Sequence, residues 1–155
     1  MFEGGCTCRA VRYRMTSAPI IVHCCHCRWC QRETGASFAL NAVIEAARVT
    51  LTSGETEMIA TPTLSGKGQK IHRCPRCKIA VFSHYPGGGD AISFIRVGTL
   101  DEPDRFAPDV HIYTSSKQPW VVLPDGARAF AEFYNPREVW SDEARARWSA
   151  AMPKS

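Results

Sequence analysis

The chain has 155 residues, of which 45% are hydrophobic and 22% are charged, and its formal net charge is +4. These values are typical of a globular protein, and no apolar run is long enough for a membrane-spanning helix. The 19 basic residues are scattered among 15 acidic ones without a run of Lys or Arg, so we do not expect a nucleic-acid-binding protein.

The N-terminal segment MFEGGCTCRAVRYRM has no basic stretch followed by an apolar stretch. It therefore predicts no secretory signal and a cytoplasmic location, where thiols stay reduced. In that compartment the eight cysteines are expected to bind metal rather than to form disulfides.

Short β-rich segments alternate with turn signals such as SGKG and PGGGD along most of the chain. They predict strands at 10–15, 19–24, 37–44, 49–54, 70–74, 80–85, 91–100 and 109–114.

A helical pattern is convincing only over 142–152, where Ser141 can cap the helix and Asp142 and Glu143 suit its positive end. We expect this helix to pack through Trp140 and Trp148. No repeat or linker composition is visible, so the sequence predicts one mainly β domain over 1–155 with a C-terminal helix.

Two isolated cysteine pairs, a C-x-C and a C-x-x-C, sum to four thiolates. Alternate residues of a strand point to the same side, and a C-x-x-C pair does the same around a turn. The pairs therefore predict a closed, structural zinc site made by Cys6, Cys8, Cys74 and Cys77. Because that site would join distant parts of the chain, loss of one ligand should destabilise the whole domain.

The segment HCCHCRWC at 23–30 supplies a further C-x-C-x-x-C group, Cys25, Cys27 and Cys30. Three protein ligands with an open fourth position are typical of catalytic zinc. Cys24 should face away from Cys25 into the core, and His26 should point away from the metal. Cys24 and His23 are alternative fourth ligands, and iron is an alternative metal.

Three thiolates leave a Zn²⁺ site with a net negative charge, which weakens it for activating water. A fourth sulfur ligand suits such a site, so the group indicates chemistry on a substrate thiol. The added charge would need a nearby cation, for which Arg28 and Arg32 are candidates by sequence distance.

The motifs GGCTC, CHCRWC, CPRC, GTLDEP and HIYTSSKQPW occur in this order between Gly4 and about Trp120. With them the chain resembles the glutathione-dependent formaldehyde-activating enzyme family, which includes centromere protein V relatives. The resemblance implies a β-tent-like fold of short antiparallel strands with zinc knuckles, and the same two zinc sites. It also implies addition of the glutathione thiol to formaldehyde, a carbon–sulfur lyase reaction at the second zinc.

Three positions depart from the family pattern: Arg9 and Lys78 stand where glycine is usual, and Gln31 stands where arginine is common. Glycine at such positions often serves a positive φ. Because Gln31 lacks the positive charge of the usual arginine, this departure weakens the expectation that the protein uses glutathione more than the expectation that it binds zinc.

The later motif suggests substrate contacts. Lys117 could pair with a ligand carboxylate and Trp120 could form an apolar wall, with Arg32 and His111 as further substrate-binding candidates. A proton carrier is not assigned, although His26 and His111 are candidates.

The sequence thus favours a zinc-dependent carbon–sulfur lyase acting on a thiol adduct of formaldehyde or another small aldehyde, with glutathione as one candidate thiol. The alternative is a non-enzymatic, zinc-scaffolded binding module. Thiol redox chemistry ranks last, because the cysteines are not flanked by a βαβ pattern. The identity of the thiol and the oligomeric state are left open.

Overall fold

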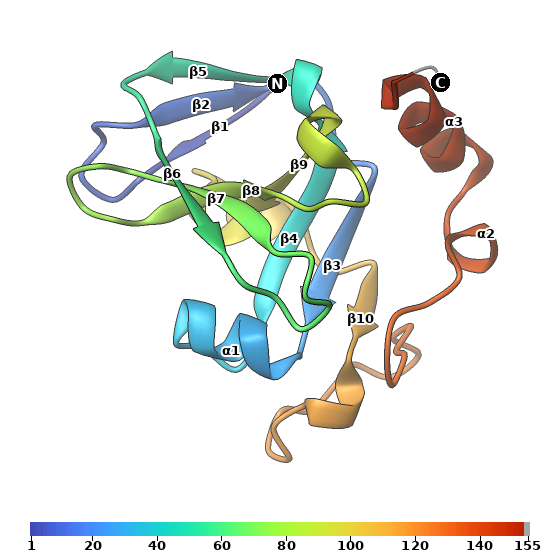
Figure 1. Cartoon of the computed structure of the whole chain (residues 1–155). Helices are drawn as coiled ribbons and strands as arrows, with labels where there is room; N and C mark the ends of the chain where they lie inside the picture. The colour runs from blue at the N-terminus through green and yellow to red at the C-terminus, as the bar shows by residue number, and fades with distance from the viewer. Residues whose placement is uncertain (154–155) are drawn as a thin grey trace.

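The computed structural model describes residues 1–153 and contains two β-sheets (Figure 1). The larger sheet has seven strands, in the spatial order β10-β3-β4-β9-β8-β7-β6. Their bounds are β3 Ile21–Cys25, β4 Ala39–Glu45, β6 Glu57–Thr61, β7 Gln69–Arg73, β8 Ala80–His84, β9 Ile92–Arg96 and β10 Val110–Ile112. The smaller, three-stranded sheet has the order β1-β2-β5, with β1 Phe2–Gly5, β2 Arg12–Met15 and β5 Val49–Ser53.

The expected mainly β fold with a C-terminal helix is confirmed, and each of the eight predicted segments contains a strand. Between the strands named for residues 1–153 the pairing is antiparallel, except that β10 runs parallel to β3. The predicted segment 91–100 is a strand only as far as Arg96, and Val97–Thr99 form a 3₁₀ turn.

Two strands were not predicted, and both lack an ordinary strand signal. β1 contains Gly4 and Gly5, which have low strand propensity. A side chain at Gly4 would lie 2.5 Å from the Tyr13 hydroxyl and 2.6 Å from the Thr99 carbonyl oxygen, so this close approach requires glycine. β6 is an edge strand whose Met58 and Ile59 are exposed, and it therefore shows no buried face.

The expectation that helix is confined to the C-terminal pattern is wrong. Helix α1 spans Arg28–Thr34, and α2 spans Pro136–Val139. α1 is too short to show a helical period, and local contacts set its ends. The Cys27 sulfur accepts the N–H of Cys30 at its start, and Gly35, with φ of 69°, ends it.

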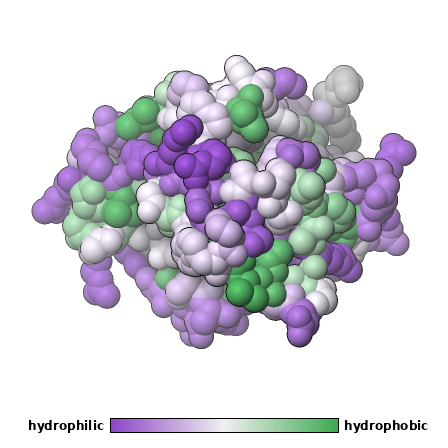
Figure 2. Space-filling model, turned by 90° about the horizontal axis from the view of Figure 1, so that it is seen from below, coloured by the Kyte–Doolittle hydropathy of each residue, from purple (hydrophilic) through white to green (hydrophobic). Residues whose placement is uncertain are grey.

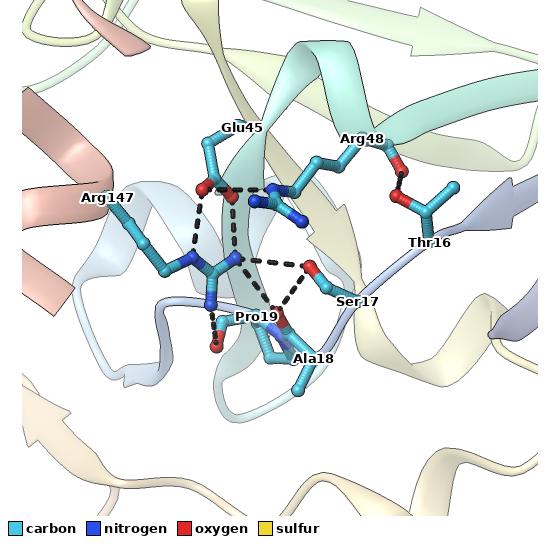
Figure 3. Close-up of polar contacts among 7 residues, drawn as sticks. All are labelled: Thr16, Ser17, Ala18, Pro19, Glu45, Arg48 and Arg147. Atoms are coloured by element: carbon cyan, nitrogen blue, oxygen red, sulfur yellow. Dashed lines mark hydrogen bonds and ion pairs between the residues drawn. The ribbon is translucent and has the colours of Figure 1, made fainter. Parts of the chain in front are cut away.

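Helix α3 spans Asp142–Ala151, and the Ser141 hydroxyl accepts the N–H of Ala144 as predicted. It lies beside the large sheet in Figure 1. Arg147 ties it there by two hydrogen bonds of 2.8 and 2.6 Å to the carboxylate of Glu45, at the end of β4, and by another of 3.0 Å to the carbonyl of Ala18 (Figure 3).

Glu45 is buried, which by itself would raise its pKa. The hydrogen bonds and charge of Arg147 outweigh this effect and hold the pKa below its usual value, so the carboxylate stays ionised. The contact is a buried ion pair that joins the last helix to the centre of the sheet.

The pleat of the large sheet divides the buried side chains into two cores. On one face, against the small sheet, Val22 and Ile44 pack with Tyr13 and Met15 of β2. On the other face, the buried side chains of the sheet pack with the C-terminal segment, among them Ile21, Val43, Ile92, Val110, Tyr134 and Trp140.

The end of the molecule that carries α1 and the segment after β10 is covered largely by hydrophilic side chains, with hydrophobic ones gathered in small patches (Figure 2). Among residues 1–153, no helix has both the length and the apolar character needed to cross a bilayer.

Arg9 and Lys78 both have a left-handed backbone, with φ of 59° and 62°. Each follows a cysteine pair, and its N–H donates to the carbonyl of the pair's first cysteine, Cys6 at 3.0 Å and Cys74 at 2.9 Å. The two turns therefore have the conformation that glycine adopts at least cost, and a residue with a side chain occupies it in both.

Replacing Arg9 or Lys78 by glycine should raise the free energy of unfolding by roughly 0.5–1 kcal/mol each, because glycine removes the left-handed strain at a smaller cost in unfolded-chain entropy. Chemical denaturation at constant metal content measures the change. Arg76→Gly is the matched control, since Arg76 is an exposed residue of the same turn without positive φ. Arg76→Gly should lower the free energy of unfolding. An increase in Arg76→Gly as large as in the Arg9 and Lys78 variants would contradict the explanation by left-handed strain.

Candidate metal centres

The first cysteine group brings together the two ends of a long chain segment. Cys6 and Cys8 follow β1, Cys74 and Cys77 follow β7, and their four sulfurs lie within 4.8 Å of one another. The Cys6–Cys8 and Cys8–Cys74 sulfur distances are 3.5 and 3.7 Å. Tetrahedral zinc with Zn–S bonds of about 2.3 Å would place its sulfurs about 3.8 Å apart, so the group fits that ion.

Backbone N–H groups point at these sulfurs, and at Cys74 and Cys77 they favour the thiolate. Val11 N–H lies 3.3 Å from the Cys6 sulfur. The N–H groups of Ile79 and Cys8 lower the pKa of Cys77 to about 6, and those of Cys77 and Arg76 lower the pKa of Cys74. Because metals bind thiolates rather than thiols, these donors prepare the group for a cation.

The second group is assembled within one short segment. Cys25 ends β3, Cys27 caps α1, and Cys30 lies in the first turn of α1, so that their sulfurs also lie within 4.8 Å of one another. Hydrogen bonds from the Cys25 and Cys30 thiols and from the N–H groups of Cys30 and Trp29 lower the pKa of Cys27. Hydrogen bonds with Cys27 and Cys30, together with burial, raise the pKa of Cys25.

The cation beside this group is one that sequence distance did not indicate. Arg96 lies on β9 and is 8% exposed, and its charge lowers the pKa of Cys30, although the hydrogen bond with Cys27 and burial outweigh it and raise that pKa to about 12. It also hydrogen-bonds Asn41 and pairs with Glu33 of α1 at 3.6 Å, while Glu33 bonds Arg73 as well. An arginine inside the apolar strand ISFIR was the available signal.

Arg28 and Arg32, the two candidates named from sequence, are both exposed. Arg28 bonds the side-chain oxygen of Gln31 at 2.5 Å. Gln31 itself is buried and donates to the carbonyls of His26 at 2.6 Å and Ser116 at 2.9 Å. The glutamine at this position therefore ties α1 to the segment after β10.

A cavity of about 570 Å³ borders the three cysteines of the second group. Its lining is mainly apolar and includes the aromatic side chains of Trp29, Phe94, Tyr113, Phe133, Trp140 and Trp148. His23 also borders it, bonded through Nε2 to the Tyr134 hydroxyl at 2.6 Å, and burial lowers the pKa of His23 to about 4. The second cysteine group thus meets a space large enough for a small molecule.

Cys24, His26 and His111 form a third buried group. The Cys24 sulfur lies 3.5 Å from Nε2 of His26, and that nitrogen lies 3.0 Å from Nδ1 of His111 on β10. Burial lowers the pKa of both histidines, that of His26 to about 4, so the pair is neutral at pH 7. The structure brings the two predicted proton carriers together, but neither lines the cavity.

The remaining predicted substrate residues also lie outside the cavity lining. Lys117 donates its ammonium to the carbonyls of Gln118 at 3.2 Å and Val121 at 2.6 Å, Trp120 is 70% exposed, and Arg32 is exposed. Substrate contact by these residues or by His111 stays a prediction. The aromatic residues at 133–148 that do line the cavity were expected only to pack.

The fold and the cysteine groups together define a mainly β protein with clustered thiols suited to metal. The family model described as glutathione-dependent formaldehyde-activating enzyme matches residues 1–116, and the chain belongs to this family. The resemblance inferred from the motifs is thereby confirmed.

A Halomonas elongata protein, named provisionally as a glutathione-dependent formaldehyde-activating enzyme, is 26% identical over 159 aligned residues, which cover 98% of this chain and 96% of the relative. The crystal structure of a Rhodobacter sphaeroides protein is 18% identical, with a TM-score of 0.49, over 64% of this chain and 87% of that one.

The uneven pKa values predict selective alkylation of the metal-free protein. Near pH 6, iodoacetamide should label Cys77 first, because its lowered pKa of about 6 favours the nucleophilic thiolate and its side chain is only half-buried. Cys27, whose pKa is also lowered, should react before Cys25, whereas Cys74 is shielded by complete burial despite its lowered pKa. Cys24 should resist, since burial raises its pKa to about 12. Peptide mass spectrometry reads the labelled positions, with unfolded protein as the control for uniform reactivity. Labelling of Cys25 before Cys27 would contradict the assigned order.

Proposed function

We propose that this protein is a carbon–sulfur lyase that joins a thiol and a small aldehyde at the Cys25, Cys27 and Cys30 group. The observation that carries the proposal is that these three sulfurs border the cavity of about 570 Å³. Membership in the glutathione-dependent formaldehyde-activating enzyme family supports the reaction class. We propose formaldehyde as the simplest aldehyde and glutathione as one candidate thiol.

The three sulfurs fit zinc, and we propose that they hold it. When bound, zinc would offer a position at which a substrate thiol is stabilised as thiolate. The thiol sulfur bonds to the aldehyde carbon as the S–H bond and the π bond of the carbonyl break, and the proton passes to the carbonyl oxygen, giving an S-hydroxymethyl hemithioacetal when the aldehyde is formaldehyde.

The residues of the chain have separate parts in this proposal. Cys25, Cys27 and Cys30 hold the ion, and Arg96 offsets the negative charge that accumulates on the sulfurs. The aromatic walls exclude water, which strengthens these electrostatic interactions. The separate group at Cys6, Cys8, Cys74 and Cys77 would hold a second, structural zinc, and we propose that 1–155 fold as one domain around both sites in the cytoplasm.

Two cysteine variants test this division of labour. Cys27→Ser should lower the zinc content from two ions to one per chain and abolish turnover, yet keep the fold, because the structural ligands remain. Cys74→Ser should lower thermal stability sharply, because its site links segments 66 residues apart. Elemental analysis, thermal denaturation and ¹³C NMR of labelled formaldehyde with glutathione are the measurements.

The results separate the proposal from the non-enzymatic alternative. Full metal content and turnover in Cys27→Ser would show that the second group is not the reaction centre. Stable binding of two zinc ions without turnover of any thiol would favour a zinc-scaffolded binding module.

A further inference from the structure

The outer wall of the cavity comes from a part of the chain that follows the family-matched region 1–116. Phe133, Trp140 and Trp148 line it on this side. Trp29 and Phe94 face them from α1 and β9. Both walls are therefore apolar and aromatic, and the C-terminal segment supplies one of them.

That C-terminal wall is firmly held. The Trp140 indole N–H donates to the Tyr134 hydroxyl at 2.6 Å, and Trp140 and Trp148 pack edge to face at a centroid distance of 5.1 Å. The ion pair between Arg147 and Glu45 fixes α3 against the sheet (Figure 3). The wall is thus preformed, which limits the ordering cost of binding.

Whether the cavity can bind a substrate carboxylate depends on the positively charged side chains in its lining. Within residues 1–153, Arg145 is the one lysine or arginine that lines the cavity. Its guanidinium donates to the Trp140 carbonyl at 2.5 Å, to the Arg137 carbonyl at 3.3 Å, and to the Asp142 carboxylate. His23 is buried, and its Nε2 is engaged with the Tyr134 hydroxyl at 2.6 Å. The lining therefore offers a substrate carboxylate no uncommitted positive charge.

A neutral polar group is available instead. Gln69 lines the cavity, and its side-chain oxygen is buried without a hydrogen-bond partner among the described residues. A buried acceptor without a partner favours a ligand that carries one neutral hydrogen-bond donor.

We infer that the thiol used at this site has an uncharged, apolar body, such as an arylalkyl or branched alkyl group, and that it is preferred over glutathione. Glutathione carries two carboxylates, and enclosing them between apolar walls that offer no uncommitted lysine or arginine is unfavourable. An apolar body gains from the same walls. This inference rests on the proposed function for its reaction, in which the sulfur–carbon bond forms and the thiol proton moves to the aldehyde oxygen.

The test compares phenylmethanethiol with glutathione on the zinc-loaded full chain, by calorimetric binding and by turnover with ¹³C-formaldehyde. Phenylmethanethiol should bind at least tenfold more tightly and show the higher kcat/KM. Equal or tighter binding of glutathione would overturn the inference. If phenylmethanethiol binds tenfold more tightly but neither thiol turns over, the proposed reaction fails while the binding preference stands.

Three variants locate the preference. Phe133→Ala should weaken phenylmethanethiol binding severalfold. Ser149→Arg, which adds a cation at an exposed position of the lining, should strengthen glutathione binding about tenfold with little effect on phenylmethanethiol. Val122→Ala is the control, since Val122 is 88% exposed and lies outside the lining. Unchanged binding of both thiols in Phe133→Ala and Ser149→Arg would show that the C-terminal wall does not set the preference.

Discussion

The pleat of β3 is the constraint on which the arrangement of this protein depends. Neighbouring residues in a strand point to opposite faces, so Ile21, His23 and Cys25 face the C-terminal segment while Val22 and Cys24 face the other way. The same alternation separates the two cores and sends the cysteines of one short motif into different environments. Cys25 meets the cavity, and Cys24 joins the buried histidine pair.

Charges around the second cysteine group are balanced through residues from three elements. Glu33 of α1 lies between Arg73 of β7 and Arg96 of β9, so this carboxylate holds two cations close together. The charge of Arg96 in turn acts on Cys30 and lowers its pKa against the opposing effects of burial and Cys27. Helix α1 thus carries both a thiol of this group, Cys30, and the carboxylate of Glu33 that pairs with Arg96. The two arginines that Glu33 contacts both come from the large sheet.

Most of the strands and the cysteine groups could be predicted from the sequence. The strands were found because alternation and turn residues are local signals, and the cysteine groups were found because ligand spacing is also local. Arg96 and the aromatic wall at 133–148 were missed, because their importance comes from contacts with residues far away in the chain. Helix α1 was missed because its N-terminus is capped by a cysteine sulfur, which is not a common capping signal. Strand β1 was missed because Gly4 is required there by the close approach of Tyr13, a residue from another strand. The left-handed turns at Arg9 and Lys78 were anticipated only through the family pattern.

The attachment of α3 to the end of β4 has a consequence for the order in which the molecule is completed. All eight cysteines and every strand precede residue 113, whereas the outer wall of the cavity belongs to 133–149. During synthesis on the ribosome, both sheets can form while the space beside Cys25 still opens to solvent. Only when residues 133–149 emerge does the space beside Cys25 acquire its outer wall, so any selectivity that this wall provides arises after the sheets have formed.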